Sequence, residues 1–90
     1  MSEVNGEYSA VADEQLDALE AAEHTAYDPI LDLVELIFTD PGTAQSLSSA
    51  LTTEDGIRFR TGVKGHYPMC VFWSHTDEGP RIEAVFPYDR

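Results

Sequence analysis

The chain has 90 residues, of which 42% are hydrophobic and 10% aromatic, and its formal net charge is −12. This length suits one compact domain, and the apolar content is too high for a wholly disordered acidic chain. The negative charge argues against unassisted binding to DNA, RNA or an anionic membrane, because the field of the molecule repels polyphosphates. The same acidity also fits a solvated surface in a salt-rich cytoplasm, where screening keeps self-repulsion small.

Charge is divided unevenly along the chain. Residues 1–56 contain 13 acidic side chains and no Lys or Arg, which gives a net charge of −13. Residues 57–90 contain four acidic side chains and five basic ones, a net charge of +1. We therefore expect an anionic ligand to bind the carboxy-terminal part and a cationic partner to bind the rest. The basic residues are Arg58, Arg60, Lys64, Arg81 and Arg90.

Cysteine content and hydropathy indicate the cellular compartment in which the protein is expected. A single cysteine, Cys70, excludes an intrachain disulfide, so the chain does not resemble a small secreted scaffold. No apolar run approaches the roughly 20 residues of a membrane span, and the first residues lack the pattern of a signal peptide. We expect a cytoplasmic protein that does not associate with membranes.

The amino-terminal half predicts two helices. Residues 1–6 carry no packing signal and are expected to be disordered, residues 7–90 form the single domain, and residues 7–11 are a candidate edge strand. Residues 12–24 are rich in helix formers and form a weakly amphipathic helix around Leu16 and Leu19.

The second helix is more clearly marked. Asp28 is the predicted cap and Pro29 the first helical residue, and residues 39–42 (TDPG) end the helix. The short linker makes the two helices an antiparallel hairpin. Residues 43–55, rich in Ser and Thr, are predicted to be a loop with at most one helical turn. Apolar side chains repeat with helical spacing at Ile30, Leu33, Val34, Ile37 and Phe38.

After Gly56 the apolar period changes to two, which is typical of strands. Three adjacent antiparallel strands are predicted, so the expected fold class is α+β, a helical hairpin packed on a three- to four-stranded antiparallel sheet. The strands cover residues 57–63, 67–75 and 81–86, joined by a tight connection at Gly65-His66 and a turn at residues 76–80.

Two arginines on the first of these strands are the main candidate functional residues. If Phe59 and its alternating neighbours Ile57, Thr61 and Val63 face the helices, Arg58 and Arg60 must point to the open face, near Lys64 or His66. Guanidinium groups two residues apart on a strand lie about 6–7 Å from each other, a spacing suited to successive phosphates of a nucleic-acid strand. The simpler alternative is that exposed arginines only guard the sheet against edge pairing.

Aromatic residues offer a second set of candidates. Tyr88, just past the last strand and close to Arg90, has a phenol that can donate a proton or a ring that can stack on a base; the alternative is that it only covers the sheet edge. The other strand aromatics are expected to be core residues. These are Tyr67, Phe72, Trp73 and Phe86.

Metal binding and thiol chemistry are not expected. His66, Cys70 and His75 share one predicted hairpin, but the spacing puts Cys70 on the opposite sheet face from His75, so the three cannot converge on one metal. Cys70 lies in mid-strand without a neighbouring base and is expected to be a buried, inert thiol. The sequence predicts no metal and no cofactor.

The order of these features resembles the RelE/ParE superfamily of bacterial and archaeal toxins over about residues 7–88. The stretches that carry the resemblance are residues 12–19 (ADEQLDAL), the helix end at residues 39–41 (TDP), and residues 55–60 (DGIRFR) followed by residues 65–67 (GHY). The resemblance implies a toxin of a type II toxin–antitoxin module with a cognate antitoxin as its partner. It also implies either ribosome-dependent cleavage of mRNA or, in the ParE branch, inhibition of gyrase.

Site residues follow from the resemblance by position. As an endoribonuclease, the chain would use Arg58 and Arg60 to stabilise charge on the scissile phosphate, and His66 or Tyr88 to handle protons. Lys64 and Arg90 would join the two arginines in holding RNA. The family pattern has an arginine directly after the tyrosine of its third strand, where this chain has Pro68 after Tyr67. A non-catalytic relative is therefore the alternative, either a gyrase inhibitor or a module that binds a basic partner through its acidic helices.

Overall fold

Five strands form one mixed sheet in the computed structural model of this chain, which describes residues 6–88. Their order across the sheet is β1-β5-β4-β3-β2, and all neighbours are antiparallel except β1 and β5, which are parallel. The α+β class is as predicted, but the sheet has more strands than expected and is not purely antiparallel. The strands are β1 (Glu7–Tyr8), β2 (Ser49–Thr53), β3 (Gly56–Gly62), β4 (Met69–Thr76) and β5 (Gly79–Pro87).

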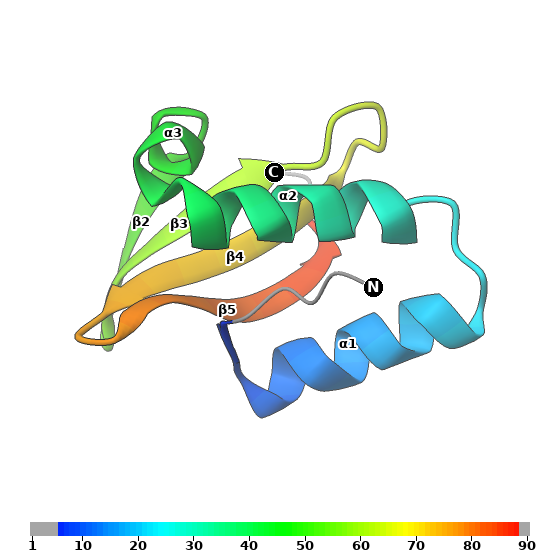
Figure 1. Ribbon diagram of the computed structural model, residues 1–90, viewed down its shortest axis with the longest axis horizontal. Coiled ribbons are helices and arrows are strands. Elements are labelled where there is room, and N and C mark those ends of the chain that lie inside the picture. Colours follow the sequence, from blue (N-terminus) through cyan, green and yellow to red (C-terminus); the bar gives the residue numbers. More distant parts are fainter. Residues whose placement is uncertain (1–5, 89–90) are drawn as a thin grey trace.

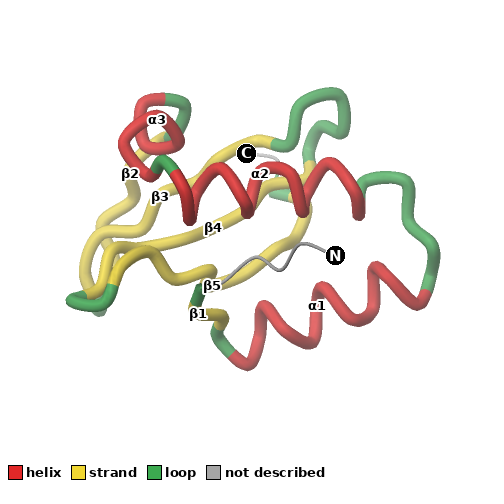
Figure 2. The backbone as a smooth tube through the Cα atoms, viewed as in Figure 1, coloured by secondary structure: helices red, strands yellow, loops and turns green. Residues whose placement is uncertain are grey.

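Three helices lie on one side of this sheet. The helices α1 (Ala10–Ala21) and α2 (Tyr27–Thr39) run antiparallel to each other over β5 and β4, and the short α3 (Pro41–Ser46) lies over β3 (Figures 1 and 2). The predicted helical hairpin is therefore present, and the opposite face of the sheet carries no helix within residues 6–88. None of these helices is long and apolar enough to cross a membrane.

The core lies between the helices and the sheet. Along β3, β4 and β5, alternate side chains point toward the helices, as the period of two in the sequence predicted. Trp73 and Ile82 are completely buried at its centre and pack with the apolar stripe of α2. The principal sheet residues in this layer are Phe59, Val63, Val71, Trp73, Ile82 and Val85, and the principal helix residues are Leu16, Ile30, Val34 and Ile37.

The helix α1 begins earlier and ends earlier than the sequence predicted. Its cap is Ser9, whose Oγ accepts a hydrogen bond from the amide of Ala12 at 3.0 Å and donates one to the carbonyl of Glu83 at 2.6 Å. Ser9 follows directly on β1, so the predicted edge strand of residues 7–11 is only two residues long. The helix ends because Glu23 has a left-handed φ of 53°, with the amide of His24 bonded to the carbonyl of Leu19 at 3.0 Å. The expectation for residues 1–6 lies outside the described residues except for Gly6.

The prediction that Asp28 caps α2 was wrong. The cap position is Ala26, which has no side-chain acceptor, and the helix starts at Tyr27. The amide of Ala26 instead donates to Nδ1 of His24 at 3.0 Å. At the other end the predicted stop is correct, but Asp40 then caps a new helix by accepting from the amide of Thr43 at 3.2 Å.

Residues 43–55 were predicted to be a loop with room for one helical turn around residues 44–51. They contain most of α3, which starts earlier than that turn, and all of β2, which was not predicted. A buried chain of hydrogen bonds fixes them: Trp73 Nε1 donates to Thr61 Oγ1 at 3.0 Å, Thr61 Oγ1 lies 2.5 Å from Ser48 Oγ, and Ser48 Oγ donates to the carbonyl of Ala44 at 2.6 Å. Ser48 thus satisfies polar groups at the edge of the core, although a segment rich in Ser and Thr has the composition of a loop.

The connection between β3 and β4 is longer than the predicted tight turn. It spans residues 63–68, with Gly65 at a φ of 81°, and β4 starts at Met69 rather than at Tyr67. The next turn leads into β5, where a register shift opposite Phe72 and Trp73 leaves Glu83 as an extra residue. Two α1 side chains satisfy the backbone there, because Ser9 bonds the carbonyl of Glu83 and Gln15 Oε1 accepts from the amide of Val85 at 2.5 Å.

Candidate functional site

Arg58 and Arg60 lie on the face of the sheet that the helices leave uncovered. Their neighbours Phe59 and Thr61 are 8% and 2% exposed and point into the core, so the alternation along β3 turns both arginines the other way. Across the strand pair, Arg60 is opposite Phe72, which also lies outside the helix-covered core. The sequence-based expectation for the placement of these two side chains is confirmed.

Arg60 stacks on a group of aromatic rings. Its guanidinium carbon is 4.9 Å from the ring centroid of Tyr88, a cation–π arrangement. The Tyr88 ring meets Phe72 edge-on at 5.7 Å, and Phe72 is stacked on Phe86 at 4.7 Å. Tyr88 and Phe86 remain 36% and 38% exposed. The open face thus presents a cation beside accessible π-surfaces.

A cleft of about 310 Å³ lies beside this pair, and Arg60, Tyr88, Cys70, Ser49 and Tyr67 contribute to its lining. It combines one positive charge, hydroxyl groups and aromatic edges on a surface that is otherwise apolar. Such a mixture suits a ligand that is anionic at one point and planar at another.

Cys70 is a buried thiol at the edge of this cleft. Burial raises the pKa of its thiol above the ordinary value of 9.0, and the nearby charge of Arg60 only partly opposes that effect. The thiol donates a hydrogen bond to the carbonyl oxygen of Pro68, with its Sγ 3.4 Å from that oxygen. Cys70 and His75 project from opposite faces of β4, because Phe72 and Cys70 face outward while Trp73 and His75 contact Phe59. The expectations of a buried thiol and of divergent faces are both correct.

Arg58 is less available than Arg60. Its Nη2 is 3.7 Å from Oε1 of Glu83 and 3.8 Å from Oδ2 of Asp55. The Glu83 side chain is only 11% exposed, and its other oxygen accepts a hydrogen bond from Ser74 Oγ at 2.7 Å. The positive charge of Arg58 is therefore partly neutralised, which the sequence did not reveal because the pairing depends on the extra residue in β5.

Arg81 is a third arginine near this surface that the sequence-based site did not include. With Arg58, Ser74 and Glu83 it lines a polar cleft of about 530 Å³, and its Nε atom is buried without a hydrogen-bond partner among residues 6–88. The signal was available in the sequence, since Arg81 precedes the buried Ile82 and must point away from the core.

The remaining candidates do not gather around Arg60. His66 lies in the connection between β3 and β4 and is not part of the lining of the Arg60 cleft. Lys64 is exposed and lines a groove beside α2 instead. Arg90 lies outside the described residues. Of the four predicted catalytic residues, only Arg60 and Tyr88 line one cleft, with Arg58 in the neighbouring one.

The expectation that the strand aromatics are mostly core residues was correct for Trp73, which is fully buried in the core. Phe72 is 7% exposed but lies on the open face against Phe86 and Tyr88, and Tyr67 is 79% exposed. Tyr67 precedes β4 in the connecting segment, so the alternation of the strand does not govern it. Phe86 is on the open face because the extra residue Glu83 shifts the register of β5.

Known proteins give no direct assignment. No protein-family model matches the sequence, and no curated protein is significantly similar to it. Functional inference for this chain therefore starts from the arrangement of its own side chains.

Proposed function

We propose that this chain is a RelE/ParE-like toxin component of a type II toxin–antitoxin module, acts in the cytoplasm, and binds a single RNA strand on its open sheet face. The observation that carries the proposal is the Arg60–Tyr88 pair, which combines a guanidinium with an accessible ring on a helix-free surface. Single-stranded nucleic acids are bound by such combinations, because cations hold phosphates while rings stack on bases.

The chemistry open to the site follows from its two central residues. In an endoribonuclease, the charge of Arg60 would offset the negative charge that develops on the scissile phosphate, and the phenol of Tyr88 would donate a proton to the leaving oxygen. Arg58 would add a second cation once RNA displaces Glu83 from its loose ion pair. The ribose 2′-hydroxyl would attack the phosphorus as the bond to the leaving oxygen breaks, and His66 would accept the proton of that hydroxyl. His66 would have to approach from the connection between β3 and β4.

The alternative is a non-catalytic relative that binds another protein, as a gyrase inhibitor or as a partner-binding module. The observation in its favour is the helical layer, where α1 and α2 carry seven carboxylates and no Lys or Arg. Within residues 6–88, none of these carboxylates forms an ion pair. Such a surface attracts a basic partner and repels RNA.

Inducing the chain in a bacterial host tests the proposal. Growth arrest with new 5′ ends in ribosome-bound mRNA, lost in the Arg60→Ala variant and relieved by the product of a neighbouring gene, is the expected result. Arrest without new mRNA ends, together with inhibition of gyrase supercoiling by the purified protein, would favour the non-catalytic alternative. Harmless expression combined with no binding of single-stranded RNA would overturn the proposal.

A further inference from the structure

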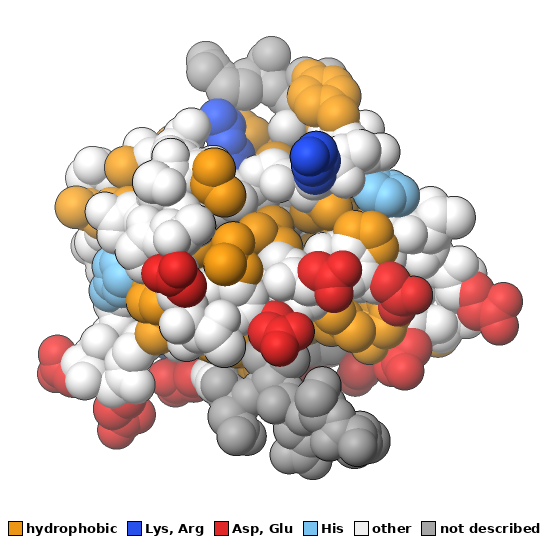
Figure 3. Space-filling view, turned by 45° about the horizontal axis from the view of Figure 1, so that its top comes forward, with side chains coloured by type: hydrophobic (Ala, Val, Ile, Leu, Met, Phe, Trp, Pro, Cys, Tyr) orange, Lys and Arg blue, Asp and Glu red, His pale blue; other side chains and the backbone are white. Residues whose placement is uncertain are grey.

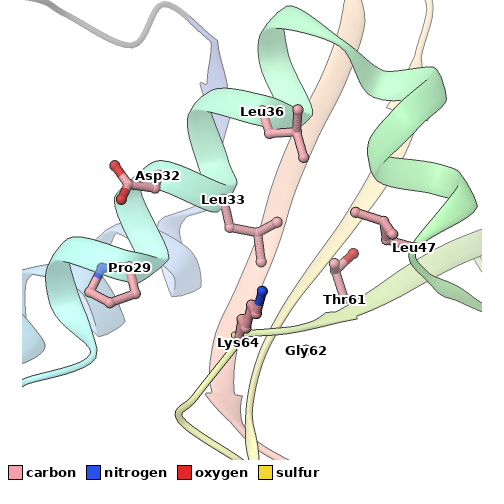
Figure 4. A pocket seen from close by; sticks show the side chains of 8 residues that line it. All are labelled: Pro29, Asp32, Leu33, Leu36, Leu47, Thr61, Gly62 and Lys64. Atoms are coloured by element: carbon pink, nitrogen blue, oxygen red, sulfur yellow. The ribbon is translucent and has the colours of Figure 1, made fainter.

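A groove on the helix side of the sheet separates α2 from β3 and from the end of α3. Its volume is about 530 Å³, and its lining includes Leu33 and Leu36 of α2, Leu47 after α3, Gly62 of β3 and Lys64. Figure 4 shows Leu33 reaching across the groove toward Leu47 and Lys64, with Asp32 at the outer rim of α2. The groove adjoins the cleft beside the Arg60–Tyr88 pair, because Leu47 and Gly62 line both.

The walls of this groove are apolar where a soluble domain would ordinarily be polar. Leu47 is 63% exposed, the highest value among the aliphatic side chains named as exposed within residues 6–88. Pro29, Leu33 and Leu36 are spaced so that they form one stripe along α2. Gly62 leaves open space where a side chain would stand, since an added Cβ would meet no atom within 4 Å. Leu33, Leu36 and Leu47, together with Gly62, thus line a trough beside α2.

The rim of the groove carries charge of opposite sign on its two sides. Asp28, Asp32 and Glu35 are exposed on α2 and form no ion pair within the described residues, while Lys64 stands on the opposite side. Figure 3 shows an apolar patch on this surface with acidic side chains along one side and basic side chains along the other. An occupant must match both the apolar floor and this polarity.

We infer that the groove binds an amphipathic helix of a different protein, with an apolar stripe flanked by Lys or Arg on the side that faces α2. Helices dock into apolar grooves through residues at i, i+3, i+4 and i+7, which matches the direction of the α2 stripe. A second copy of this chain does not fit. Its own helical segments contain no Lys or Arg, so a pair of copies would bring carboxylates together at the rim. This inference does not rest on RNA binding at Arg60 and Tyr88, although Leu47 and Gly62 border both sites.

A displayed library of helical 20-residue peptides, selected against the purified protein, tests the inference. We expect the enriched peptides to share an apolar stripe flanked by basic residues, and to shift the amide signals of Leu33 and Leu36, which line this groove but not the Arg60 cleft, in NMR spectra. Enrichment of acidic peptides, a footprint on the open sheet face, or no enrichment at all would each overturn it.

Two substitutions sharpen the test with one enriched peptide. Leu47→Asp should weaken its binding at least tenfold, whereas Val11→Asp, which alters a similarly exposed apolar side chain on α1, should not change it. Asp32→Lys should weaken binding of the basic peptide and strengthen binding of a version that has Glu in place of its basic residues. Equal effects of Leu47→Asp and Val11→Asp, or no response to the charge exchange, would contradict docking in this groove.

Discussion

At the scale of single residues, Arg60 and Tyr88 are the pair on which the proposed RNA binding depends. Arg60→Ala removes a phosphate contact and Tyr88→Ala removes a stacking surface, and each should lower the affinity for a single-stranded RNA of 12 nucleotides about tenfold. Tyr88→Phe keeps the ring and should retain most of the affinity. Fluorescence anisotropy at fixed salt measures all three variants.

Arg58→Ala is the matched control for Arg60→Ala. Because Glu83 and Asp55 already oppose its charge, its removal should cost less affinity than the removal of Arg60. If Arg58→Ala is the more damaging change, the centre of the site has been misplaced.

Glu23 has a backbone conformation that is unfavourable for a residue with a Cβ atom. It holds the left-handed position that ends α1, with a φ of 53°, where glycine is the favoured residue. Glu23→Gly should raise the free energy of unfolding by about 1 kcal/mol in urea titrations, because the strain of a Cβ at this φ is removed. Glu23→Gln removes the charge but keeps the strain, so an equal gain in that variant would attribute the effect to charge instead.

The Cys70 thiol makes the free energy of unfolding fall as the pH rises into the alkaline range. Burial raises the pKa of the folded thiol above 9.0, so the unfolded chain releases its proton first as the pH rises. The contribution of the thiol to the free energy of unfolding is therefore complete below the pKa of the unfolded chain and is lost as the pH rises through the folded pKa. Burial likewise raises the pKa of Tyr8 and Tyr27 above 10.0, which extends the loss to higher pH.

Urea titrations of Cys70→Ala across this range check the sign. The variant should lose less stability than the wild-type chain between pH 8 and pH 10, whatever its stability at neutral pH. A steeper loss in the variant would mean that the folded thiol does not have a raised pKa.

At the scale of elements, the packing of α1 on β5 depends on polar contacts as well as apolar ones. Gln15 Oε1 accepts from the amide of Val85 next to the extra residue Glu83, where the ladder to β4 is interrupted. Gln15→Ala leaves that amide without a partner and should cost about 1–3 kcal/mol. Hydrogen exchange at the Val85 amide should accelerate in this variant, while Gln15→Glu, which keeps an acceptor, should protect it. Unchanged exchange in Gln15→Ala would show that this contact does not hold the bulge.

The elements that the sequence predicted well are those with a strong apolar period. The α2 stripe and the alternation of β3 from Phe59 onward appear where expected, because burial of one face fixes them. Ile57, which was expected to face the helices, is 56% exposed near the start of β3. The elements that it missed, α3 and β2, are rich in Ser and Thr, and β2 (SALTT) has little apolar signal of its own. Pairing with β3 makes it a strand, and such tertiary pairing leaves no local trace.

At the scale of the whole molecule, the two faces differ in charge because the two halves of the sequence do. The helical layer comes from the half without Lys or Arg, and the open face carries Arg58, Arg60 and Arg81 from the other half. The sequence therefore predicted the face that Arg58 and Arg60 take, whereas the place of Arg81 was not predicted. It could not predict their neighbours, since Glu83 meets Arg58 across strands and Tyr88 meets Arg60 only once β5 is in place.

The most direct test of the account is an NMR titration of the ¹⁵N-labelled protein with a single-stranded RNA. Amide shifts are expected to gather on the open sheet face, around Arg60, Phe72, Phe86 and Tyr88, and to spare α1 and α2. Shifts confined to the helical layer, or no shifts at RNA concentrations that saturate a known RNA-binding domain, would contradict it.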